Sequence, residues 1–174
     1  GLASNLAPTF QVREATVADI HVLAEHRAAM FRDMGRLAPD GEAPLVRATV
    51  DYFRDALPRG EYLGWVAQAS STEEPIGGAG AQLRPILPRP RSGGDGLELG
   101  PEAIILNVYV TPGWRRRGVG EALMRSVLAA LGQRGIGRIV LHASDDGRRL
   151  YERLGFVPTN EMRLDKTGSE MTAR

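Results

Sequence analysis

The feature that most constrains this chain is a strand pattern that runs directly into an arginine- and glycine-rich helix start, "NVYVTPGWRRRGVGEALM" at residues 107–124. The preceding run "AIILNVYV" (103–110) is rich in β-branched and aromatic residues, which favours a buried strand. Pro112 and Gly113 end it, and a helical pattern starts at Val119. Cations are disfavoured at a helix start, because the dipole is positive there. The sequence therefore predicts that a negatively charged group binds at this turn.

The turn has the properties of an anion site. The first N–H groups of a helix have no partner within it, and they favour negative charge. Gly118 and Gly120 present no side chains to an approaching ligand. Adjacent arginines add forked donors that suit phosphate oxygens. These arginines are Arg115, Arg116 and Arg117. Because the turn lacks the Gly-Lys-Ser/Thr of a Walker A loop, it predicts a pyrophosphate-like ligand and not ATP hydrolysis.

Composition narrows the class of protein. The 174 residues suit one domain with a sizeable core, and 43% apolar with 25% charged residues is ordinary for a globular protein. A net charge of +1 argues against a nucleic-acid-coating surface. The absence of cysteine excludes disulfides, thiolate metal sites and a cysteine nucleophile, and it fits a cytoplasmic protein. No apolar run is long enough for a membrane span, and the first residues do not form a signal peptide.

The order of patterns predicts a mixed α/β fold with helices packed on one central sheet. Thr16 and Asp19 predict a helix start, and glycines end the later helical runs. "GGAG" (77–80) lies in a strand pattern and is interpreted as close backbone packing. The expected strands are 9–16, 61–70, 75–86, 103–110, 138–144 and 156–165. The expected helices are 16–34, 42–56, 119–132 and 145–154, and 85–101 is expected to form a loop.

These residues resemble a known family. Arg115-x-x-Gly118-x-Gly120 after a Val-x-Pro strand end is similar to the acetyl-CoA signature of the GCN5-related N-acetyltransferases (GNAT). "LYERLGF", about thirty residues later, resembles the Tyr-x-x-x-Gly-Phe helix end of that family. The resemblance implies a mixed, mostly antiparallel sheet of six to seven strands with about four helices on its faces. It implies a single acetyltransferase domain over 9–166, with flexible termini at 1–8 and 167–174.

The resemblance also implies the site. The backbone of Arg116–Glu121 is expected to hold the pyrophosphate of coenzyme A, and the end of the 103–110 strand to pair with its pantetheine arm. Tyr151 is expected to protonate the leaving thiolate, since a phenol has a pKa of about 10. Many relatives have Asn seven residues before this tyrosine, where this chain has Ser144. The expected cofactor-binding residues are Val108, Tyr109, Val110, Arg115, Arg116, Arg117, Gly118, Val119, Gly120, Glu121 and Ser144.

Other parts of the mechanism are less defined by the sequence. Glu102 and His142 are candidate general bases, each weighed against a structural role, and a water or an already neutral amine would need neither. A bulge at the end of the 103–110 strand could leave an N–H to stabilise the oxyanion, as in the family. Trp114 is interpreted mainly as a packing residue and not as an adenine platform. No metal is expected, because His21, His26 and His142 lack ligand spacing with carboxylates.

The sequence thus predicts an acyl-CoA-dependent N-acetyltransferase that moves acetyl from acetyl-CoA to a primary amine by direct attack in a ternary complex. The alternative is a non-catalytic acyl-CoA-binding or sensing module of the same fold. The acceptor, a small molecule or a peptide, is expected to bind over 18–57, 85–101 and 159–165. Nucleic-acid and membrane partners are not expected. The acceptor's identity, the acyl length and a possible homodimer stay open.

Overall fold

The computed structural model describes residues 8–165, which divide into two compact units, 8–142 and 143–165. The first unit contains α1 (Ile20–Asp33), α2 (Glu42–Arg59) and α3 (Val119–Gln133). Its strands are β1 (Phe10–Glu14), β2 (Tyr62–Ala69), β3 (Pro75–Arg84), β4 (Arg89–Pro90), β5 (Leu97–Glu98), β6 (Glu102–Val110) and β7 (Ile139–Leu141). The second unit contains α4 (Arg148–Arg153). No helix within 8–165 is long and apolar enough to cross a bilayer.

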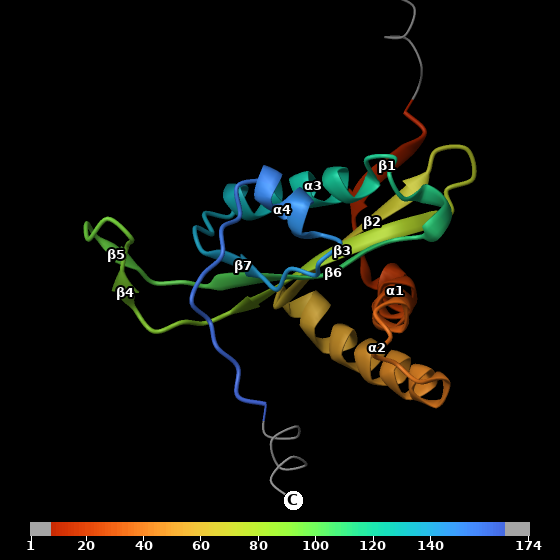
Figure 1. Cartoon of the computed structure of the whole chain (residues 1–174), viewed down its shortest axis with the longest axis horizontal. Helices are drawn as coiled ribbons and strands as arrows, with labels where there is room; N and C mark the ends of the chain where they lie inside the picture. Colours follow the sequence, from red (N-terminus) through yellow and green to blue (C-terminus); the bar gives the residue numbers. More distant parts are fainter. Residues whose placement is uncertain (1–7, 166–174) are drawn as a thin grey trace, which may run out of the picture. The chain divides into compact units, whose positions relative to one another are not determined.

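A five-stranded sheet in the order β1-β2-β3-β6-β7 forms the centre of the first unit (Figure 1). Every neighbouring pair is antiparallel except β6 and β7, which are parallel. The ladder between these two strands is short and ends at the pair Ile105 and Leu141. The mixed, mostly antiparallel fold class is confirmed. The sheet has five strands and not the six to seven expected.

Two adjacent glycines of β3 show which helices cover which face of the sheet. A Cβ on Gly77 would point toward Leu123 of α3, whereas a Cβ on Gly78 would point toward His26 of α1. Because successive residues of a strand face opposite sides, α3 lies on one face and α1 on the other. In Figure 1, α2 lies on the same side as α1. The α1/α2 core includes Ile20, Leu23, Ala24, Val50, Phe53, Ala56, Tyr62 and Val66.

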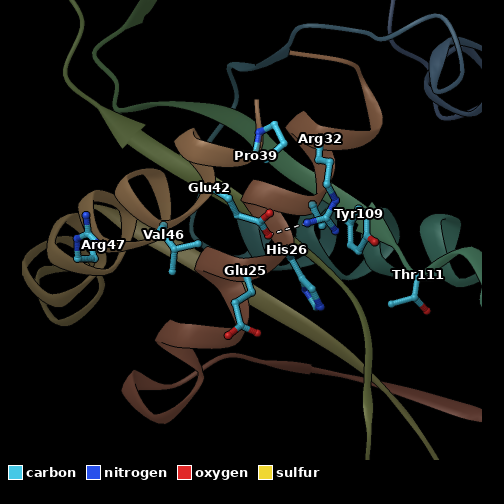
Figure 2. A pocket seen from close by; sticks show the side chains of 11 residues that line it. Glu25, His26, Arg32, Pro39, Glu42, Val46, Arg47, Tyr109 and Thr111 are labelled. Atoms are coloured by element: carbon cyan, nitrogen blue, oxygen red, sulfur yellow. Dashed lines mark hydrogen bonds and ion pairs between the residues drawn. The ribbon is translucent and has the colours of Figure 1, made fainter. Parts of the chain in front are cut away.

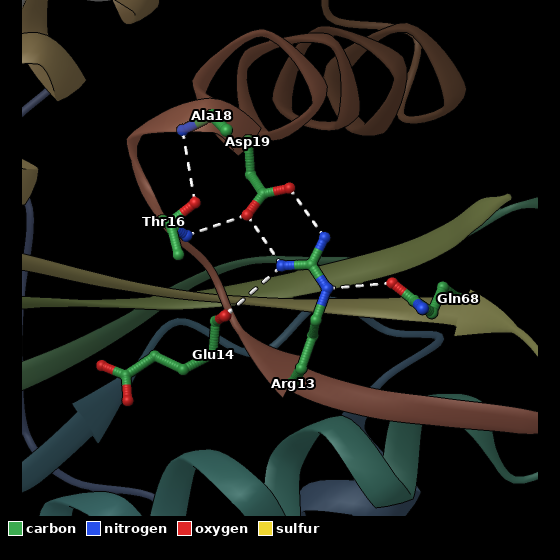
Figure 3. Close-up of polar contacts among 6 residues, drawn as sticks. All are labelled: Arg13, Glu14, Thr16, Ala18, Asp19 and Gln68. Carbon is green, nitrogen blue, oxygen red and sulfur yellow. Dashed lines mark hydrogen bonds and ion pairs between the residues drawn. The ribbon is translucent and has the colours of Figure 1, made fainter. Parts of the chain in front are cut away.

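The chain leaves β1 through a capping box, as the sequence predicts. The Thr16 hydroxyl accepts from the Ala18 N–H at 3.3 Å, and the Asp19 carboxylate accepts from the Thr16 N–H at 2.8 Å. Arg13 binds the same carboxylate with both arms of its guanidinium, each at 2.8 Å (Figure 3). The hydrogen bond from Arg13 is the main reason that the pKa of Asp19 lies below its usual range. This ion pair sets where the first helical segment begins.

Two expectations for the first unit need correction. The second helix does not end at Ala56 but continues to Arg59, because Pro58 lies in the last turn and Gly60, with φ of 69°, supplies the left-handed stop. The segment 85–101 is not only loop: β4 and β5 pair as a small hairpin that projects from the sheet (Figure 1). The expected strand at 138–144 is reduced to β7.

The second unit is a short helix with the chain on either side of it. The helix ends as expected, with Leu154 at its C-cap and Gly155 at φ of 98°. The strand expected over 156–165 is wrong, because no residue there is in a strand. Val157, Met162 and Leu164 are exposed, so the apolar pattern does not report burial in a sheet. The expected flexible termini lie outside the described residues, apart from Pro8.

Candidate active site

The arginine-glycine turn forms a helix start with no side-chain cap. Pro112–Trp114 makes a short 3-10 turn, and Gly118 adopts the left-handed conformation at φ of 83° immediately before α3. No side chain caps the first turn of α3. Val119, Gly120 and Glu121 therefore present N–H groups that the helix itself does not use. Such a helix start favours an anion, as the sequence predicts.

The three arginines of the turn have different environments. Arg115 is held in place, because its Nε donates to the Val110 carbonyl at 2.9 Å and its guanidinium pairs with Asp33 at 2.7 Å. Arg117 stacks over the Trp114 ring at 3.9 Å. Arg116 is exposed, has φ of 63° and makes no ion pair within residues 8–165. Arg115 thus fastens the turn to β6 and α1, whereas Arg116 remains available to a ligand.

Trp114 has the packing environment that the sequence suggests. Its ring makes an edge contact with Phe10 of β1, with centroids 6.4 Å apart, and its other contact is with Arg117. The side chain is only partly buried. Trp114 thus links the turn to the first strand of the sheet.

A β-bulge interrupts β6 at Asn107. Gly80 pairs with Leu106 and Gly78 with Tyr109, so Asn107 and Val108 together face the single residue Ala79. Asn107 has φ of 61°, a left-handed conformation that asparagine tolerates better than most residues. Beyond the bulge, Val108, Tyr109 and Val110 continue the strand. Their edge toward β7 lies outside any ladder formed by the described residues, because pairing ends at Ile105.

A hydrogen-bonded network fixes the side chain at the bulge. Arg27 of α1 donates to Asn107 Oδ1 at 2.6 Å, and Asn107 Nδ2 donates to the Tyr62 hydroxyl at 2.8 Å. Burial raises the pKa of Tyr62 to about 12. The Tyr62 ring stacks on Phe53 with centroids 4.4 Å apart. Residues from α1, α2, β2 and β6 therefore converge on the bulge.

Two cavities open on the α1/α2 face of the sheet, one on each side of the bulge. The larger, of about 640 Å³, extends from Tyr109 and Thr111 to the facing ends of α1 and α2 (Figure 2). It contains charges of both signs, and Arg32 pairs with Glu42 at 2.6 Å across it. The smaller, of about 290 Å³, is lined by Asn107 itself. Both cavities lie in the region where the sequence places the acceptor.

His26 is a buried histidine in the wall of the larger cavity (Figure 2). Its Nδ1 has no hydrogen-bond partner within residues 8–165 and lies against Gly78. Its ring is 5.3 Å from that of Tyr109. Desolvation lowers the pKa of His26 to about 4, so the imidazole is neutral at neutral pH. Gly78 leaves room for this ring, which explains part of the "GGAG" run.

Glu102 is at the centre of an ion cluster and is therefore a poor candidate base. It is 4% exposed and accepts from Arg84, Arg89 and Arg138. Burial alone would raise the pKa of this carboxyl, but hydrogen bonds from Arg138 and Arg84 outweigh it and hold the pKa below its usual range. The cluster ties β3, the β4 end of the hairpin and the residue before β7 to the start of β6. This favours the structural role for Glu102.

Ser144 and Tyr151 lie in the second unit. The Ser144 hydroxyl accepts from the Gly147 N–H at 3.2 Å in the turn before α4, but no side chain caps the helix itself, whose N-cap is Gly147. Tyr151 is partly buried and contacts Phe156 with ring centroids 6.2 Å apart. Burial raises the pKa of Tyr151, which keeps the phenol protonated at neutral pH. The catalytic role of Tyr151 and the cofactor contact of Ser144 stay predictions.

The other two histidines, His21 and His142, are both exposed. His142, which follows β7, is exposed, and its role as a base stays a prediction. His21 is exposed on α1. No group of three or more His, Cys, Asp or Glu within residues 8–165 is arranged to hold a metal ion.

The sequence interpretation missed the network around the bulge. The sequence alone assigns no role to Arg27, His26 or Tyr62. One signal was present: an asparagine within the otherwise apolar strand "AIILNVYV" is a residue type that tolerates the left-handed conformation.

The structure is that of a mixed α/β protein with a bulged central strand, an uncapped start of α3 and two cavities on the α1/α2 face of the sheet. Residues 25–156 match the sequence model of the acetyltransferase (GNAT) family. The chain therefore belongs to this family. The match includes both the turn and Tyr151.

Solved structures share the fold. The chain is 34% identical to a GCN5-related N-acetyltransferase from Ralstonia eutropha JMP134, with a TM-score of 0.78 over 91% of this chain and 99% of that one. A predicted acetyltransferase from Clostridium acetobutylicum, solved with acetyl-CoA, is 24% identical with a TM-score of 0.77 over 91% and 97%. A histone acetyltransferase, TAP1 of Glycine max, is 41% identical over 54 residues. That match spans 31% of this chain but only 23% of the soybean protein.

Proposed function

We propose that the protein transfers an acetyl group from acetyl-CoA to a primary amine by direct attack in a ternary complex. The observation that carries the proposal is the uncapped start of α3, with Gly118 left-handed and Arg116 exposed beside it. Membership of an acetyltransferase family and the C. acetobutylicum structure with acetyl-CoA support the same donor.

The residues of the turn and strand divide the binding of acetyl-CoA between them. The N–H groups of Val119, Gly120 and Glu121, with Arg116, would receive the pyrophosphate. Val108, Tyr109 and Val110 would pair with the pantetheine arm through the strand edge that β7 leaves outside its ladder. Arg115 acts indirectly, because its bonds to Val110 and Asp33 hold the turn in place.

In the reaction, the neutral amine nitrogen attacks the thioester carbonyl carbon and a carbon–nitrogen bond forms. The carbon–sulfur bond then breaks, and the thiolate takes a proton from the phenol of Tyr151. The amine loses its proton to water or to a base, after which the phenol is reprotonated. A phenol with its ordinary pKa of about 10 is already protonated at neutral pH, and burial raises the pKa of Tyr151, so the phenol enters the step protonated.

Calorimetry with acetyl-CoA tests the donor site. Gly118→Ala is expected to weaken binding roughly tenfold or more, because alanine disfavours φ of 83° and adds a methyl group beside the N–H groups. Gly113→Ala is the matched control, because a Cβ there meets open space and φ is not positive. Equal affinity of both variants with wild type, or no heat from acetyl-CoA, contradicts the proposal.

Thiol release with a panel of amines tests the chemistry. Tyr151→Phe is expected to lower kcat at least about tenfold with little change in the affinity for acetyl-CoA. Undiminished turnover would remove the acid role from Tyr151. Binding of acetyl-CoA without turnover of any amine would favour the sensing module instead.

A further inference from the structure

The smaller cavity beside the bulge has an unusual charge pattern. Arg27 is the only charged residue among those that line it, and no carboxylate lines it. Its other polar groups are neutral and come from Thr49, Tyr52, Tyr62, Gln82 and Asn107. Gln82 donates a hydrogen bond of 3.0 Å to the Tyr52 hydroxyl. We call this space the Arg27 cavity.

Arg27 is a half-buried cation without a counter-ion. Within residues 8–165 its guanidinium bonds to the neutral Asn107 amide and lies over the Phe31 ring at 4.9 Å, and it makes no ion pair. Desolvation lowers the pKa of this guanidinium. A buried charge is costly unless it is paired, and one hydrogen bond leaves most of the five guanidinium donors available. The arrangement therefore lacks a negatively charged partner.

The walls of the cavity fit a small flat body. Phe53 and Tyr62 are stacked, and Tyr52 lies beside Phe53 with centroids 6.0 Å apart. Leu45 and Leu106 add aliphatic surface. At about 290 Å³, the volume is at the lower end of the range for small-molecule sites. A long polar chain or a multi-ring sugar exceeds this space.

The larger cavity differs in chemistry, since Glu25 and Glu42 balance Arg32 and Arg47 there. It offers no uncompensated cation comparable to Arg27. Because Asn107 lines the smaller cavity, a group seated there lies directly beside the bulge, next to the strand residues 108–110 that the proposed function assigns to the pantetheine arm.

We propose that the Arg27 cavity receives the non-reacting part of the acceptor, and that this part consists of a carboxylate and a small flat apolar body. The role of this ligand as an acetyl acceptor rests on the proposed function, but its binding to the cavity does not require acetyl-CoA. A small amino acid-like amine fits this class. Polyamines and aminoglycosides, which carry several positive charges, do not.

Direct binding tests the inference without turnover. In calorimetry, 3-phenylpropanoate is expected to bind at least about tenfold more tightly than 3-phenylpropanamide, which differs only in the charge of its head group. Arg27→Gln keeps a donor for Asn107 but removes the charge, and should abolish this difference. Arg27→Lys keeps the charge and should retain most of it. Equal affinity of wild type for the two probes overturns the proposal.

Two alanines of α2 form a matched pair for locating the probe. Ala48 lines the Arg27 cavity and Ala43 lines the larger cavity, and both are exposed. Ala48→Leu is expected to weaken 3-phenylpropanoate binding at least about fivefold by filling the space, whereas Ala43→Leu leaves it unchanged. The reverse result would assign the probe to the larger cavity and overturn the proposal.

Two measurements, acetyl-CoA binding and a comparison of two amine substrates, separate this inference from the proposed function. Calorimetric binding of acetyl-CoA to the same variants reports the donor site alone, and Ala48→Leu should not change it. If acetyl-CoA binds but spermidine is acetylated in preference to L-phenylalanine, the inference fails while acetyl transfer stands. If 3-phenylpropanoate binds as expected and acetyl-CoA does not, the cavity stands and the proposed function fails.

Discussion

The side-chain amide of Asn107 on β6 donates a hydrogen bond of 2.8 Å to the hydroxyl of Tyr62 on β2, although β3 lies between these strands. The contact is possible because Gly80 of β3 has no side chain. A Cβ built there would lie 1.7 Å from the Tyr62 hydroxyl oxygen. The tyrosine thus reaches across its neighbouring strand to hold the bulge.

Asn107→Ala is expected to destabilise the protein by about 2–5 kcal/mol. Alanine disfavours φ of 61°, which costs about 1–2 kcal/mol, and the buried Tyr62 hydroxyl loses its partner, which costs about 1–3 kcal/mol. Asn107→Gly removes the same hydrogen bonds without the backbone strain and should lose less. Urea unfolding measures both. Equal losses would show that strain contributes nothing.

Gly80→Ala is expected to lower the free energy of unfolding by about 3 kcal/mol or more, because its methyl group overlaps the buried Tyr62 hydroxyl. The control is Gly132→Ala in α3, where a Cβ meets open space and alanine should stabilise the helix by about 0.5–1 kcal/mol. Thermal unfolding of the two variants should therefore move in opposite directions. A stable Gly80→Ala protein contradicts the packing assigned to Tyr62.

The protein should become less stable as the pH is lowered, because of the titration of His26. Burial lowers its pKa from 6.5 to about 4, so between these values the unfolded chain binds a proton that the folded chain does not. The free energy of unfolding therefore rises with pH across this window. It decreases by up to roughly 3 kcal/mol as the pH drops toward 4.

His26→Gln should flatten this part of the stability profile, measured by urea unfolding from pH 7 to pH 4. His21→Gln removes an exposed imidazole from the same helix and is the matched control. If His26→Gln keeps the wild-type slope over this range, the buried imidazole is not the source of the pH dependence.

Glu102→Gln is expected to destabilise the protein by about 3 kcal/mol, because Arg84, Arg89 and Arg138 lose the buried carboxylate that they share. Glu98→Gln removes a more exposed partner, 3.7 Å from Arg89, and should cost under about 1 kcal/mol. Denaturant unfolding measures this difference. Below the unfolding temperature, the pH profile of kcat should not change in Glu102→Gln. Loss of the acidic limb of this profile, where a general base becomes protonated, would restore Glu102 as the general base.

Local rules in the sequence were enough for most of the fold. The capping box at Thr16, the glycine stops at Gly35 and Gly155 and the alternation of apolar residues each report on a few neighbouring residues. The strand expected at 156–165 fails because its apolar residues are exposed, and alternation alone does not show whether a partner strand exists.

The candidate site also has a part that the local sequence predicts and a part that it does not. The turn at 115–121 was predictable, because its arginines, glycines and helix start are adjacent in the sequence. The Arg27–Asn107–Tyr62 network joins residues 45 and 80 positions apart, and nothing local indicates that they meet. The role of Glu102 was likewise not predictable, because the sequence does not show how many arginines contact this carboxylate in the folded protein.

The bulge in β6 shifts the alternation of side chains by one position. Leu106 before it and Tyr109 after it pair with Gly80 and Gly78, and both therefore face the two cavities. In an unbroken strand, Leu106 would share its face with Val108 and Val110, and Tyr109 would point into the α3 core. Deleting one residue here would thus exchange the linings of opposite sides of the sheet, so the length of this strand is as constrained as its composition.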